Sequence, residues 1–103
     1  MGDSLLKVII KKEEILRNLI KEMYDYWQEN DDDGHHKSSE GHITISQCFD
    51  NYFEDQKEYW MIEVYSYIFC NGRRFEYQGT TKEEVIQKAI DYFKDKFRSY
   101  KGD

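Results

Sequence analysis

The chain has 103 residues, of which 39% are hydrophobic and 17% aromatic, and its formal net charge is −6. A chain of this length forms one domain, residues 1–103, and its aromatic content excludes a disordered protein. No apolar run reaches the ~20 residues of a membrane span, the first residues do not match a signal peptide, and two cysteines are too few for a disulfide scaffold. We therefore expect a cytoplasmic protein with no membrane partner.

The first predicted element is a helix over residues 4–29. Its apolar residues recur three, four or seven positions apart, as in a helix with one buried side: Leu5, Ile9, Leu16, Ile20, Met23 and Trp27. Asp3 or Ser4 would cap the first turn. An alternative keeps "LLKVII" as a short strand and begins the helix near Lys12. The acidic residues 30–41 contain no large apolar side chain, which predicts a solvated loop.

Residues 42–79 predict a three-stranded antiparallel sheet. The first strand, residues 42–49, alternates apolar and polar residues, and the second, residues 59–70, is apolar on both sides, as a central strand should be. Residues 50–58 would form the loop between these two strands. Trp60 is expected in the core.

The dipeptide NG at residues 71–72 predicts a two-residue turn before the third strand. This turn would pair Ile68 with Phe75 and Tyr65 with Gln78. One side of the sheet is then apolar, and the other is lined by aromatic and charged residues. The apolar side contains Trp60, Ile62, Val64, Ile68, Phe75 and Tyr77, and the other side contains Tyr59, Met61, Glu63, Tyr65, Tyr67, Phe69, Arg74, Glu76 and Gln78.

Residues 81–100 predict a second helix, which completes an α+β fold of order α-β-β-β-α with two flanking helices. Thr81 and Glu84 have the spacing of a capping box, and apolar residues recur at helical spacing from Ile86 to Tyr100. Two arrangements remain open. Both helices cover the apolar side, which leaves the tyrosines to solvent or to a homodimer partner, or one helix covers each side.

No arrangement of residues predicts catalysis, a bound metal or a cofactor. His35, His36 and His42 lie near acidic residues, but they lack the spacing of a zinc site, and the glycine and glutamate of a calcium-binding loop are missing. Neither Cys48 nor Cys70 has a histidine placed to activate it. We therefore expect a binding protein rather than an enzyme.

Two groups of residues are candidates for binding a partner. Residues 20–63 carry twelve acidic and three basic residues, which would repel nucleic acid and attract a host protein with a basic surface. Ordinary solvated loops are the alternative explanation of these acids. The tyrosine side of the sheet would add aromatic contacts. The candidate partner-binding residues are Asp31, Asp32, Asp33, Tyr52, Phe53, Glu54, Asp55, Glu58, Tyr65, Tyr67 and Phe69.

The stretch "VYSYIFCNGRRFEYQGTTKEEVIQKAIDYF", residues 64–93, resembles the double-stranded-RNA-binding domain. This resemblance implies the same element order and, as an alternative function, RNA binding through Arg73, Arg74, Lys82 and Lys88. The family has a lysine cluster at the start of its second helix. Here Lys82 is followed by two glutamates, which would repel phosphates.

The hairpin ending "RRFEYQG", the T-x-E-E helix start and the segment "AIDYFKDKF" are similar to those of small phage α-β-β-β-α proteins and of compact acidic anti-CRISPR proteins. This resemblance implies a phage or mobile-element protein that binds, and can inhibit, a host protein. In such inhibitors, carboxylates can occupy positions where the target expects nucleic-acid phosphates.

Overall fold

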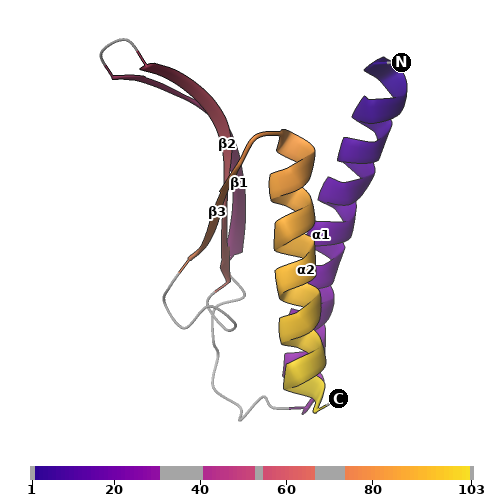
Figure 1. The fold of residues 1–103 in the computed structure, drawn as a ribbon. Helices are drawn as coiled ribbons and strands as arrows, with labels where there is room; N and C mark the ends of the chain where they lie inside the picture. The colour runs from indigo at the N-terminus through magenta and orange to yellow at the C-terminus, as the bar shows by residue number, and fades with distance from the viewer. Residues whose placement is uncertain (1, 31–40, 53–54, 67–73, 103) are drawn as a thin grey trace.

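The computed structural model describes residues 2–30, 41–52, 55–66 and 74–102 (Figure 1). In chain order the elements are α1 (Gly2–Asn30), β1 (Gly41–Tyr52), β2 (Asp55–Ser66), β3 (Phe75–Gly79) and α2 (Lys82–Lys101). The strands form an antiparallel sheet of order β1-β2-β3. The predicted α+β class and the α-β-β-β-α order are confirmed.

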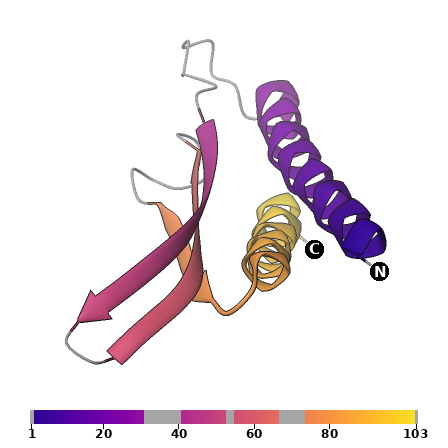
Figure 2. The ribbon, with the colours of Figure 1, turned by 90° about the horizontal axis from the view of Figure 1, so that it is seen from above.

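Both helices lie on the same side of the sheet (Figures 1 and 2). α2 packs against β2 and β3. α1 packs mainly on α2, and its backbone lies farther from the strands. Of the two predicted arrangements the first is therefore observed, and no described helix covers the other side of the sheet. The two helices run in the same direction, because both begin at the end of the molecule that holds the β1–β2 hairpin.

The core lies between the two helices and the apolar side of the sheet. Its buried members are Leu16, Leu19, Met23, Trp27, Ile62, Val64, Val85, Ile86, Ala89, Ile90, Phe93 and Phe97. Trp60, which was expected in this core, is only partly buried, and the Nζ atom of Lys82 lies 5.9 Å from the centroid of its ring. It packs against the margin of the core, where β3 ends opposite it.

α1 is a single helix, so the alternative of an initial short strand is wrong. It begins at Gly2, and Asp3 and Ser4 therefore lie inside the helix rather than before it. Lys12 contacts Glu83 at 2.8 Å and Glu13 contacts Lys82 at 3.0 Å, which fixes the level at which α2 begins. The residues of α1 before Lys12 extend past the start of α2 (Figure 1).

The helix predicted over residues 81–100 is observed one residue later, at Lys82–Lys101, because Thr81 is its capping residue. Thr81 accepts a hydrogen bond from the backbone N–H of Glu84 at 3.1 Å, as the capping box requires. The helix ends at Gly102, whose φ of 86° lies in the left-handed region that glycine adopts without strain.

The predicted loop over residues 50–58 is wrong. Tyr52 pairs directly with Asp55, so both strands continue through most of that range. β3 ends opposite Trp60, and beyond this point β1 and β2 form a two-stranded ribbon that leaves the rest of the molecule (Figure 1). Such a ribbon tolerates polar residues on both sides, which is why its sequence has the composition of a loop.

The predicted register between β2 and β3 is also wrong, by four residues. Phe75 pairs with Val64 rather than with Ile68, and Tyr77 pairs with Ile62. Because the shift is an even number of residues, each side chain stays on its predicted side of the sheet. The NG turn and residues 67–70 lie outside the described residues.

Candidate interaction surfaces

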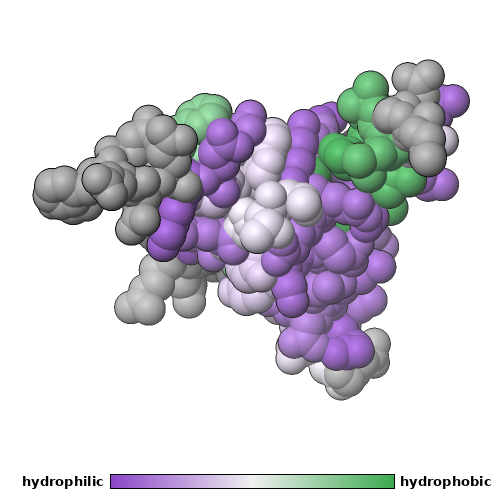
Figure 3. All heavy atoms as spheres, turned by 45° about the horizontal axis from the view of Figure 1, so that its top comes forward, coloured by the Kyte–Doolittle hydropathy of each residue, from purple (hydrophilic) through white to green (hydrophobic). Residues whose placement is uncertain are grey.

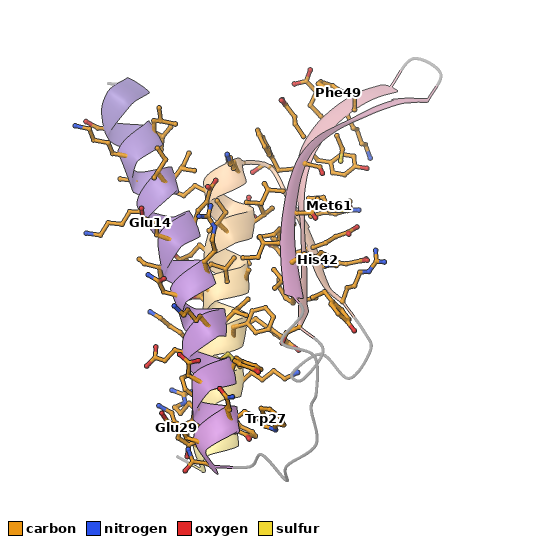
Figure 4. All side chains as sticks on the ribbon, turned by 180° about the vertical axis from the view of Figure 1, so that it is seen from behind. Glu14, Trp27, Glu29, His42, Phe49 and Met61 are labelled. Atoms are coloured by element: carbon orange, nitrogen blue, oxygen red, sulfur yellow. The ribbon has the colours of Figure 1, made fainter. Side chains whose placement is uncertain are left out.

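The side of the sheet that faces away from the helices, here called the open face, is the first candidate surface. Cross-strand partners share a side of an antiparallel sheet, so the register groups its residues in rows. Met61 lies between Ser46 and Gln78, and Glu63 lies between Thr44 and Glu76. Figure 4 labels Met61 and His42 on this sheet and shows both helices on one side of the strands.

Aromatic and sulfur-containing side chains remain partly exposed on the open face. Tyr59, Met61 and Tyr65 are all of intermediate burial. His42 stacks on Tyr65, with 5.5 Å between the ring centroids and an interplanar angle of 24°. Tyr and Met side chains of this kind are enriched where proteins contact one another. Tyr65 is thus on the predicted side, and Tyr67 and Phe69 lie outside the described residues.

The described charges of the open face balance approximately. Arg74 contacts Glu63 at 3.4 Å, and Glu76 is exposed beside this pair. The pair is exposed enough that water competes with it, so both partners can exchange this contact for one with another molecule. The open face is therefore amphipathic rather than acidic.

The residues of the predicted acidic surface are only partly described. Asp31, Asp32, Asp33, Phe53 and Glu54 lie outside the described residues. Tyr52 and Asp55 are strand residues at the end of the β1–β2 ribbon, and Glu58 is exposed on the same ribbon. Glu58 pairs with Phe49, which is 62% exposed, so an acid and an aromatic ring lie side by side there. Figure 4 labels Phe49 on this ribbon, beyond the level of α2.

The N-terminal part of α1 is an apolar surface that sequence reasoning missed. Leu5, Leu6, Val8 and Ile10 are between 42% and 54% exposed. They form the green patch at the free end of α1 in Figure 3. The difference in length between the two predicted helices could have indicated this surface. The first helix is longer, so apolar residues over about two turns at its start cannot pack on the second.

A groove between α1 and β1 is the second feature that the sequence did not predict. It contains a cavity of about 540 Å³ and a smaller one of about 190 Å³. Both cavities are lined by Arg17 and Ile43, so they follow one another along the same groove. The groove exists because α1 rests on α2 and leaves a space beside β1.

The cations that would bind RNA in the alternative function already have partners. Lys82 contacts Glu13 at 3.0 Å, Arg74 contacts Glu63 at 3.4 Å, and the Nζ atom of Lys88 lies 5.9 Å from the centroid of the Tyr77 ring. Arg73 lies outside the described residues. An RNA phosphate would have to compete with these partners and with the neighbouring carboxylates.

Comparisons with protein-family models, with curated proteins and with solved structures find no match to this chain. Within the described parts of the chain, neither helix has an apolar stretch long enough to cross a bilayer. Function is therefore argued from the surfaces themselves.

Proposed function

We propose that this protein is a non-enzymatic module that binds a partner protein through the open face of its sheet. The observation that supports this proposal is the position of both helices on one side of the sheet, which leaves Tyr59, Met61 and Tyr65 partly exposed on the other. Surfaces that combine exposed aromatic and apolar groups with a polar margin are typical of protein interfaces.

The proposed partner is a host protein with a basic surface. The acidic residues 20–63 give the chain an attractive field for such a surface, and Glu58 is an exposed member of that range. Glu76, outside the range, adds an exposed acid on the open face. Phage or mobile-element origin, and inhibition of the host protein by carboxylates in place of phosphates, belong to the same proposal. They rest on the sequence resemblance alone.

The test is affinity purification from the native host with the parent chain and with a Met61→Arg variant. Met61 lies in the middle row of the open face, so an arginine there adds bulk and a charge of the same sign as the proposed partner's surface. We expect at least a tenfold loss of the captured partner, which corresponds to about 1.4 kcal/mol of binding free energy.

The matched control is Asn18→Arg, which adds the same charge at an exposed position of α1. Circular dichroism of both variants checks that the fold is kept. Equal capture by the parent and Met61→Arg would contradict a role for the open face. Recovery of duplex RNA, with loss on Arg74→Ala, would favour the RNA-binding alternative instead.

A further inference from the structure

Within the described residues, the outer edge of β1 is unpaired. β1 pairs with β2 on one side, and no strand of the described chain pairs with it on the other. Residues 41–49 contain no proline, lysine, arginine or acid. Natural proteins usually protect a long edge strand with such residues or cover it, because its unpaired backbone groups can pair with another chain. β1 is thus an unprotected edge to which an extended segment of another chain could add as a further strand.

The groove beside this edge has a lining that suits an added strand. Ile20 of α1 and Ile43 and Ile45 of β1 supply apolar side chains along it. The two cavities, of about 540 and 190 Å³, extend from the Asp25 end of α1 to Lys82. A strand placed next to β1 would therefore have α1 over one of its sides (Figure 4).

On the α1 side of the groove, the cations Arg17 and Lys21 lie in the middle, and the acids Glu13 and Asp25 lie at the two ends. Arg17 is 65% exposed and has only a 3.6 Å contact with Glu13 one turn away. Lys21 is exposed, and in the described part of the chain it makes no ion pair. Arg17 and Lys21 lie one helical turn apart and repel each other. A bound anion would reduce this repulsion.

We propose that this groove binds an extended acidic segment of a partner protein, which adds to β1 as a fourth strand. Main-chain hydrogen bonds to the free edge supply affinity, and alternate side chains supply selectivity. Apolar side chains of the segment contact Ile20 and Ile43, and its carboxylates contact Arg17 and Lys21. This site borders the open face, because His42 and Tyr65 also line its larger cavity, but it does not depend on the function proposed above.

Charge favours a foreign acidic segment over a second copy of this chain. If β1 paired with β1 of another copy, residues 41–49 would bring no carboxylate to Arg17 and Lys21. Lys21 would then be covered without an ion-pair partner, and Arg17 with only its 3.6 Å contact to Glu13, which is unfavourable. An acidic strand removes this cost.

The test uses a fluorescein-labelled peptide of four Val-Glu repeats, measured by fluorescence anisotropy against the full chain. Two further peptides carry backbone N-methyl groups on all valines or on all glutamates, because an N-methylated amide cannot donate to β1. We expect saturable binding of the parent peptide, and binding at least about tenfold weaker for one of the methylated forms. We also expect slower amide hydrogen exchange in residues 41–49 when the parent peptide is bound.

Lys21→Glu and Lys94→Glu form a matched pair of variants, since both lysines are exposed on helices and only Lys21 lines the groove. We expect Lys21→Glu to weaken the Val-Glu peptide about two- to fivefold, and Lys94→Glu to leave it unchanged. Absence of saturable binding, or equal binding of all three peptides, would overturn the proposal. So would a parent chain that sediments as a dimer with residues 41–49 already protected from exchange.

Discussion

Glu84 is the residue at which the sheet and the second helix are joined. Its carboxylate accepts hydrogen bonds from the backbone N–H of Thr80 at 3.0 Å and from the Thr80 hydroxyl at 2.8 Å, and the Tyr77 hydroxyl donates to it at 3.3 Å. The Thr80 backbone hydrogen bond is the largest cause of a lowered pKa of Glu84, followed by the Thr80 hydroxyl. The capping motif was predicted from Thr81 and Glu84, but its extension to Thr80 and Tyr77 depends on where β3 ends.

The lowered pKa of Glu84 predicts an acid-dependent stability. The folded state favours the ionised carboxylate, so this stabilisation is present above the ordinary pKa of 4.5 and is lost as the pH falls through the lower folded value. In urea unfolding, a Glu84→Gln variant should be less stable than the parent at pH 7, and the difference should shrink below pH 4.5. Thr80→Val removes the hydroxyl hydrogen bond to Glu84, so the stability of this variant should depend less on pH over the same range than that of the parent. A difference that is constant from pH 7 to pH 3 would contradict the assignment.

At the scale of elements, helices were predicted better than strand connections. The second helix has a capping residue, a buried side and a terminal glycine that all agree, so its bounds follow from local sequence. The β2–β3 register does not follow from the NG dipeptide, because burial of Val64 opposite Phe75 favours a pairing four residues away. The side of the sheet on which each residue lies was still predicted correctly, because side chains alternate between the two sides along a strand.

The exposure of the β1–β2 ribbon predicts that its side chains contribute little to the free energy of unfolding. Phe49 is 62% exposed on the ribbon, whereas Ile62 of the same sheet is fully buried. We expect Phe49→Ser to change the free energy of unfolding by less than about 1 kcal/mol and Ile62→Ala to lower it by about 2–5 kcal/mol. Urea unfolding measures both. A loss for Phe49→Ser as large as that for Ile62→Ala would mean that the ribbon packs against the rest of the molecule.

At the scale of the molecule, sequence predicted the topology but not the spaces between its parts. Periodicity identifies which side of α1 is apolar, but it does not say that α1 rests on α2 rather than on the sheet, which leaves the groove beside β1. Leu5, which is 52% exposed, was predicted to belong to the apolar side of this helix, because the spacing of apolar residues is the same with or without a partner. The partner-binding role of the acidic residues stays a prediction.

Charge reversal tests that role on the whole chain. A Glu54/Asp55/Glu58→Lys variant changes the net charge from −6 to 0, and we expect weaker capture of a basic partner. Capture by the parent should also fall as salt rises from 0.05 to 0.5 M, with a smaller change for the variant, because salt screens exposed charges. If the variant captures the partner as well as the parent does at both salt concentrations, the acidic residues do not bind it.

The packing of α1 on α2 also determines when the protein can fold. Lys12 and Glu83 are 71 positions apart in the chain, and the buried residues of α1 contact a helix that is synthesised after the whole sheet. During translation α1 can become helical, but its apolar side cannot pack on α2 until α2 has also been made. Contacts between such distant parts of a chain slow folding. Until α2 has been made, the growing polypeptide exposes the apolar side of α1, and exposed apolar surface of this kind favours aggregation.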